Sequence, residues 1–260
     1  PNIKALSKSN EKTVLKLWEG LGYYARAKNL HKTSKVLSKK YGGQIPNNFS
    51  QLKELPGIGD YTANVLLALI YNQPRIGIDG NVRRVLSRLF NLKVENAANL
   101  FRTERNADFA EALMEFGSLI CKPKDPTCQK CKIKNFCAYY ASETKIKFKR
   151  KIKLRSKNYD VFCYLKKNEK QIALTKNNNV GFLKKFNLPK IKEASKKNKD
   201  WKFLCNYKNF ISNKRLNINL YYKFASKIPP KYNWYYFNQN SEFIPSFTKK
   251  IFKQVSSLYL

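Results

Sequence analysis

Four cysteines stand close together in the sequence, in the pattern C-x6-C-x2-C-x5-C, at Cys121, Cys128, Cys131 and Cys137. No charged segment followed by an apolar stretch directs the chain to an oxidising compartment, so a set of disulfides is disfavoured. Thiolates at short spacing bind zinc or an iron–sulfur cluster. Structural zinc sites usually present two C-x2-C pairs separated by a longer loop, which differs from the pattern here. The four cysteines therefore indicate a metal centre.

A Pro-Gly-x-Gly turn forms a second group with chemical potential. A short helix is expected over Phe49–Leu55, the turn contains Gly57, Ile58 and Gly59, and a second apolar-periodic helix follows. The glycines permit a positive φ angle and a close approach of another backbone. The free N–H groups of the second helix can then bind a phosphate oxygen, as in a helix–hairpin–helix motif. The alternative is an ordinary turn between two packed helices.

A carboxylate stands at the start of another expected helix. Asp79 lies in the sequence I-D-G-N-V and directly precedes a helix expected over Val82–Phe90. Aspartate at this place commonly caps the helix N-terminus. It is also a candidate for a catalytic carboxylate.

Two glycines and several aromatic residues follow one another in the sequence W-E-G-L-G-Y-Y-A-R-A. Leu21, Gly22, Tyr23 and Arg26 belong to this segment, which connects two expected helices. Such a connection could serve packing alone. It could equally present side chains that insert between stacked bases.

The elements that position these residues divide the chain into two parts. In residues 1–141 the apolar residues recur at helical spacing, which predicts an all-α domain. Residues 142–157 are rich in Lys and Arg without apolar periodicity, which indicates a basic linker. Residues 158–260 contain short β-prone runs and predict a smaller α+β domain, so the chain as a whole is α+β. The expected strands include Tyr159–Leu165, Gln171–Thr175 and Leu216–Phe224.

The charge indicates a polyanionic partner. The chain has 260 residues with 52 Lys and Arg against 17 Asp and Glu, a formal net charge of +35. Such an excess favours nucleic acid as the partner ahead of an anionic membrane. No apolar run is long enough for a transmembrane helix, and we expect a monomeric cytoplasmic protein.

Taken together, these segments resemble the adenine DNA glycosylases of the endonuclease III helix–hairpin–helix superfamily. The resemblance is dense over residues 1–141, and residues 158–260 more weakly resemble the Nudix fold. It implies a 4Fe–4S cluster on the four cysteines. It also implies that the partner is double-stranded DNA with adenine opposite 8-oxoguanine or guanine.

The resemblance assigns roles to individual residues. Asp79 would stabilise the positively charged sugar left when adenine departs, electrostatically or through a transient covalent bond. Tyr61 stands where the lyases of this superfamily place a lysine that attacks the sugar, so the resemblance implies a monofunctional glycosylase. Leu21 and Tyr23 would wedge the base stack open. A bifunctional glycosylase/lyase remains the alternative enzyme.

The sequence also departs from the family pattern. The lesion-reading loop of the family matches Ile211-Ser212-Asn213, where only Ser212 is retained. The general-acid glutamate of the family is not matched, because Glu11 stands in a different context, and the family segment that carries it lies upstream of the matching region. We therefore expect impaired excision, or a lesion-binding module without activity. The glutamate-rich box of Nudix hydrolases is absent, with only Glu193 near its place.

Overall fold

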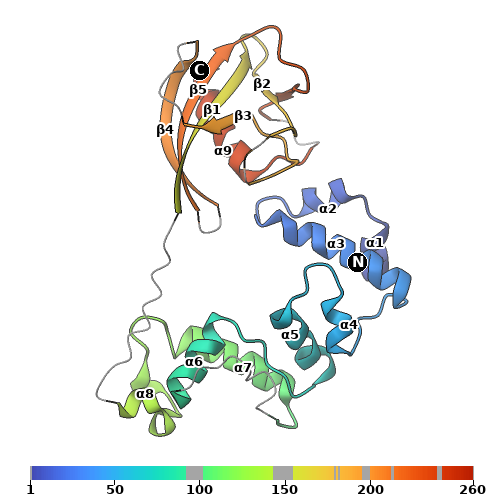
Figure 1. The fold of residues 1–260 in the computed structure, drawn as a ribbon, viewed down its shortest axis with the longest axis vertical. Helices are drawn as coiled ribbons and strands as arrows, with labels where there is room; N and C mark the ends of the chain where they lie inside the picture. Colours follow the sequence, from blue (N-terminus) through green and yellow to red (C-terminus); the bar gives the residue numbers. More distant parts are fainter. Residues whose placement is uncertain are drawn as a thin grey trace. The chain divides into compact units, whose positions relative to one another are not determined.

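The computed structural model folds into two compact units (Figure 1). The first unit combines residues 1–9 with residues 28–149, and the second combines residues 10–27 with residues 150–260. The residues that the structure describes are 2–91, 102–142, 155–178, 180, 182–194, 200–211, 214–238 and 242–259. Most of the expected basic linker and Ser212 lie outside these ranges.

The first unit is helical throughout its described residues. Its helices are α1 (Ile3–Lys8), most of α3 (Tyr24–Lys40), α4 (Phe49–Lys53), α5 (Asp60–Tyr71), α6 (Gly80–Phe90), α7 (Asn106–Leu119) and α8 (Ala138–Ala141), with short 3-10 turns η2 (Cys128–Lys130) and η3 (Lys134–Phe136). The helices expected over Phe49–Leu55 and Val82–Phe90 are confirmed as α4 and α6. Helix α5 ends at Asn72 and helix α6 ends at Asn91, and both asparagines have the left-handed conformation.

Helix α5 contributes residues to two hydrophobic clusters, one on each side of the helix. Leu67 packs with residues of α3 and α4, in a cluster of Leu37, Leu52, Leu55, Ala63 and Leu67. Ala68 packs with residues of α6 and α7, in a cluster of Ala68, Ile76, Val82, Leu86 and Ala110. Helix α5, which follows the Pro-Gly-x-Gly turn, is therefore packed on two sides.

The second unit combines helices with a mixed sheet. Its elements are α2 (Glu11–Leu17), β1 (Arg155–Lys166), β2 (Gln171–Leu174), β3 (Lys190–Glu193), β4 (Lys202–Ile211), β5 (Lys214–Phe224), β6 (Asn233–Tyr236), α9 (Ser246–Val255) and the 3-10 turn η4 (Ser256–Tyr259). The strands are ordered β4-β5-β1-β2-β6, and β3 pairs with β1. Strand β1 runs parallel to β5 and antiparallel to β2 and β3. The expected helical and α+β folds are thus both observed, but residues 10–27, expected in the helical part, belong to the second unit.

One helix covers the core of this sheet with a continuous apolar face. Helix α9 buries Phe247, Ile251, Phe252 and Val255, a spacing that places all four on one side of the helix. They pack against apolar residues of β1, β2 and β5. The N-terminal end of α9, which contacts Glu19 and Tyr24, is consequently fixed on the sheet.

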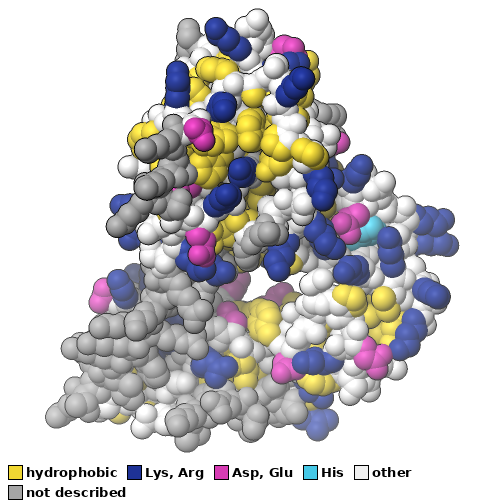
Figure 2. Space-filling view, turned by 45° about the horizontal axis from the view of Figure 1, so that its top comes forward, with side chains coloured by type: hydrophobic (Ala, Val, Ile, Leu, Met, Phe, Trp, Pro, Cys, Tyr) yellow, Lys and Arg dark blue, Asp and Glu magenta, His cyan; other side chains and the backbone are white. Residues whose placement is uncertain are grey.

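Basic side chains outnumber acidic ones on the face drawn in Figure 2. The net charge of +35 is therefore carried at the surface, where it can meet an anionic partner. None of the described helices has both the length and the apolar character that a bilayer span requires.

Candidate functional site

The Pro-Gly-x-Gly turn packs tightly onto α3. Gly57 has a φ of +81°, and a Cβ at this position would stand 2.6 Å from Asn29 Nδ2. The hydroxyl of Thr33 donates a hydrogen bond of 2.8 Å to the carbonyl of Pro56. Only glycine can adopt this φ angle and also leave room for Asn29, which explains why the turn has glycine at residue 57.

The turn presents the N-terminus of α5. Gly59 is the N-cap residue and supplies no side-chain hydrogen bond to the N–H groups of the first turn. Asp60 forms an ion pair with Lys53, which offsets its negative charge. The side chain of Ile58 packs against the α3–α4–α5 cluster. The backbone at the start of α5, rather than the Ile58 side chain, is therefore the group suited to bind an anion.

Tyr61 lies on the first turn of α5 between two other segments. Its ring is 42% exposed, and its hydroxyl donates to Met114 Sδ on α7 at 3.5 Å. A Cβ on Gly77 would stand 2.9 Å from Tyr61 Cε2. Gly77 thus allows the segment before α6 to run directly against Tyr61.

Asp79 caps α6, as one of the two sequence interpretations predicts. Its Oδ1 accepts hydrogen bonds from the N–H groups of Asn81 at 2.8 Å and Val82 at 2.7 Å. Its Oδ2 accepts a longer bond of 3.3 Å from the Asn81 side-chain amide. The helix dipole stabilises a carboxylate at this end. Capping employs one oxygen and leaves the other more loosely held, so capping and catalysis are compatible.

Arg84 connects the segment after Asp79 to the cysteine loop. One guanidinium nitrogen donates to Asn81 Oδ1 at 2.9 Å, and Nε donates to the Cys121 carbonyl at 2.8 Å. Helix α7 also approaches closely here, since a Cβ on Gly117 would stand 2.7 Å from Asn81 Cβ. No motif in the sequence singles out Arg84. The sequence feature that could have indicated Arg84 is its residue type, because arginine is much less frequent than lysine in this chain.

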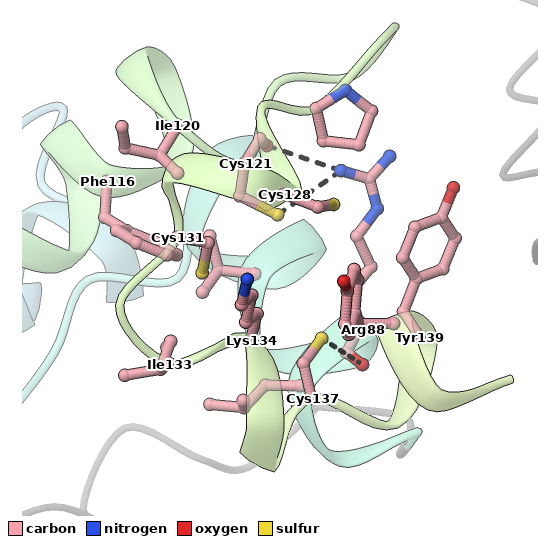
Figure 3. A pocket seen from close by; sticks show the side chains of 14 residues that line it. Arg88, Phe116, Ile120, Cys121, Cys128, Cys131, Ile133, Lys134, Cys137 and Tyr139 are labelled. Atoms are coloured by element: carbon pink, nitrogen blue, oxygen red, sulfur yellow. Dashed lines mark hydrogen bonds between the residues drawn. The ribbon is translucent and has the colours of Figure 1, made fainter.

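The structure brings the four predicted cysteines around one pocket (Figure 3). All four are free thiols, and Val85, Phe116, Ile120 and Ile133 are among the apolar residues that line the same pocket. Within the described ranges, no three side chains of His, Cys, Asp or Glu meet as ligands of a single metal ion. The thiols therefore surround a space instead of converging on one point.

Arg88 is a second residue of the site that no sequence motif indicates. It is only 4% exposed and donates to the Lys122 carbonyl at 2.7 Å and to Cys121 Sγ at 3.3 Å. Its guanidinium carbon lies 4.9 Å from the centre of the Tyr139 ring. Burial raises the pKa of Cys128, the other three thiols raise it further, and Arg88 lowers it. Arg84 and Arg88 are four residues apart on α6, which places both on the face toward the loop.

The remaining predicted residues belong to the second unit. Residues 20–23, called the glycine turn below, have positive φ angles at Gly20, Gly22 and Tyr23. Leu21 and Tyr23 are 69% and 67% exposed, so the turn displays two large apolar side chains. A left-handed conformation at a residue such as Tyr23 costs about 1 kcal/mol or more, which neighbouring contacts must offset.

Trp18 stabilises the glycine turn through contacts with both the turn and Arg26. The indole N–H of Trp18 donates to the Gly22 carbonyl at 3.0 Å. Arg26 lies over the Trp18 ring, 5.8 Å from its centre. Arg26 thus has a structural contact in addition to the predicted role in DNA binding.

Known proteins resemble this chain in sequence. A family model described as HhH-GPD superfamily base excision DNA repair protein matches residues 1–107. The adenine DNA glycosylase of Buchnera aphidicola subsp. Baizongia pistaciae is 32% identical over 237 residues, which cover 86% of this chain and 56% of that protein. The human adenine DNA glycosylase is 31% identical over 150 residues, covering 53% of this chain and 28% of that protein.

A relative of a second type also matches. Endonuclease III of Thermotoga maritima is 32% identical over 143 residues, which cover 52% of this chain and 67% of that protein. The chain spans about half the length of the Buchnera adenine DNA glycosylases that it matches. The chain belongs to the HhH-GPD superfamily of base excision DNA repair proteins.

Proposed function

We propose that the chain removes adenine from DNA where adenine faces 8-oxoguanine or guanine, as a monofunctional glycosylase. The observation that carries the proposal is Asp79 at the N-terminus of α6, with Oδ2 only loosely engaged and with the Tyr61 ring packed against Gly77, two residues before it. Relatives named adenine DNA glycosylase support the choice of base.

The reaction breaks the bond between the sugar carbon and a ring nitrogen of adenine. The electron pair of that bond leaves with the base, and an acid protonates the base so that it departs neutral. Asp79 faces the resulting sugar cation as a carboxylate, or bonds to it transiently, in the manner of a glycosidase. Water then adds its oxygen to the sugar carbon and releases a proton.

Tyr61 favours hydrolysis over the lyase reaction. A lyase of this superfamily needs an amine to form a Schiff base with the sugar, and a phenol cannot form one. Tyr61 is partly exposed and its hydroxyl donates to Met114 Sδ. We assign Tyr61 to shaping the sugar pocket.

The chain binds DNA through a contact with a phosphate and through side chains that insert between the bases. The start of α5, with no side-chain cap, binds a phosphate oxygen, and Leu21 and Tyr23 enter the base stack. The adenine is extruded from the duplex before the reaction. The high positive charge raises affinity without regard to sequence.

The cysteine pocket fits a 4Fe–4S cluster. Each thiolate of such a cluster binds a different iron, so its ligands surround a volume, as the four thiols do here. A single zinc ion would need them to converge. The buried Nε–H of Arg88 also has no acceptor among the described residues, although Arg88 lines this pocket. When bound, the cluster supplies a fixed shape to the loop that contacts DNA.

The second unit reads 8-oxoguanine in a Nudix-like fold, with Ser212, which lies outside the described residues, at the reading loop. No glutamate of the chain matches the general acid of the family, so we propose that excision by residues 1–260 is slow. Lesion binding without excision is the second candidate function, and this missing match is the observation that favours it.

The proposal is tested by single-turnover excision with protein in excess over a duplex that contains 8-oxoguanine opposite adenine. Slow adenine release that Asp79→Asn abolishes supports it. Borohydride trapping of a protein–DNA adduct would instead identify the lyase. Preferential binding of the lesion duplex with no release by the unmodified chain would identify the lesion-binding module.

A further inference from the structure

We propose that Glu19 and Tyr24 are positioning residues that attach the glycine turn (residues 20–23) to helix α9 and its neighbours, so that the second unit holds the wedge. The inference rests on the proposed function in one respect, that Leu21 and Tyr23 enter the base stack. The two residues stand immediately before and immediately after the turn, and each reaches a segment more than 160 residues away.

Tyr24 is the anchor at the C-terminal end of the turn. It is 5% exposed, and its hydroxyl accepts a hydrogen bond of 3.1 Å from the Ser246 N–H. The same hydroxyl lies 2.9 Å from Ser246 Oγ. Its ring packs against Phe186 and Phe243, with centroid distances of 5.5 Å and 4.8 Å. The backbone of Tyr23 therefore leads directly into a residue fixed by polar and aromatic contacts.

Glu19 is the anchor at the N-terminal end. Its side chain is 13% exposed, and Oε1 accepts from Lys249 Nζ at 2.9 Å and from the Ile244 N–H at 3.3 Å. Its Oε2 accepts from Lys16 Nζ at 2.7 Å. Glu19 thus joins α2 to the N-terminal region of α9 at the residue before Gly20.

Two anchors are useful here because the turn is intrinsically adaptable. Gly20 and Gly22 have no Cβ, and nothing lies within 4 Å of where one would stand. The turn is therefore not held by packing of its own glycines. Fixing both ends reduces the conformations of Leu21 and Tyr23 before DNA arrives, which lowers the entropy cost of insertion.

Wedge insertion can be measured without catalysis. We would place 2-aminopurine beside the 8-oxoguanine:adenine pair and record its fluorescence at saturating protein, since unstacking of the probe raises the signal. Tyr24→Phe removes only the hydroxyl, and Tyr259→Phe is its matched control because Tyr259 donates to the Lys166 carbonyl at 2.7 Å elsewhere in the unit. Glu19→Gln is matched by Glu193→Gln, which breaks an exposed ion pair with Lys157.

The expected result is loss of most of the fluorescence rise for Tyr24→Phe and Glu19→Gln, with both controls like the unmodified chain. Ser246→Ala removes the Oγ contact but keeps the backbone N–H that donates to Tyr24, so it should lose no more of the rise than Tyr24→Phe does. The double variant should lose no more than Tyr24→Phe alone. Urea unfolding of each variant shows that the unit is folded at the assay condition.

The outcomes separate the inference from the proposed function. No fluorescence rise with the unmodified chain would overturn the wedge role itself. A rise in the unmodified chain that Tyr24→Phe and Glu19→Gln retain in full would overturn the positioning role alone. Additive losses in the double variant would also contradict it, because the hydroxyl of Tyr24 and Ser246 would then act separately.

Discussion

Gly77 lies directly against the ring of Tyr61, so closely that a Cβ on Gly77 would stand 2.9 Å from Tyr61 Cε2. Asp79 follows two residues later and caps α6. One short segment therefore links the ring on the first turn of α5 to the carboxylate at the start of α6. The position of either group depends on a residue that has no side chain.

Replacing Gly77 with alanine should destabilise the first unit by about 1–3 kcal/mol, because the new methyl group must displace Tyr61 and Val65. Gly80→Ala is the matched control, since a Cβ there meets nothing within 4 Å. Urea unfolding of both variants measures the difference. Equal stability of the two variants would show that the segment shifts without cost.

Two substitutions at Asp79 should separate capping from catalysis. Asparagine caps a helix as well as aspartate does, so Asp79→Asn should keep stability and lose adenine excision. Asp79→Ala should lose excision and also about 0.5–2 kcal/mol of stability. Thermal unfolding and single-turnover excision are compared. Retained excision in Asp79→Asn would remove the carboxylate from the mechanism.

The cysteine pocket makes a prediction about metal content. Protein purified without oxygen should contain about four irons per chain, and Cys137→Ser should lower both iron content and DNA affinity. Cys205→Ser, outside the pocket, is the control for loss of one thiol. Elemental analysis measures the iron and zinc content, and stoichiometric zinc without iron would contradict the 4Fe–4S cluster.

Affinity for duplex DNA should fall steeply as salt rises, because the binding relies on phosphate neutralisation. The logarithm of the binding constant should decrease with the logarithm of salt concentration by about 0.9 per phosphate contact. Fluorescence anisotropy at several salt concentrations gives this slope. A flat response would show that the charge of +35 serves another purpose.

The Glu19 contacts should weaken in acid. Burial acts to raise the pKa of Glu19, but hydrogen bonds from Lys16 and Lys249 outweigh it and hold the pKa below the ordinary value of 4.5. The carboxylate therefore contributes stability fully above pH 4.5 and loses it as the pH falls through the lower folded pKa. The stability difference between the unmodified chain and Glu19→Gln should shrink over that acidic range in urea unfolding. A constant difference would argue against ionic contacts.

Local patterns were sufficient to predict the elements that depend on near neighbours. The helix over Val82–Phe90 and the strand over Tyr159–Leu165 follow from apolar spacing, and α6 and β1 contain them. The cysteine spacing likewise predicted four residues that line one pocket, because a short loop limits how far apart they can lie.

Only the tertiary structure decided which distant residues support these elements. Residues 10–27 were predicted to belong with the helical part, yet they pack within the second unit, where Tyr24 meets Ser246. The burial of Arg88 against the cysteine loop was equally invisible in the sequence. Periodicity reports which face of a segment is apolar, but not which distant segment covers that face. That choice depends on shape and hydrogen-bond complementarity between residues that are remote in the chain and adjacent only after folding.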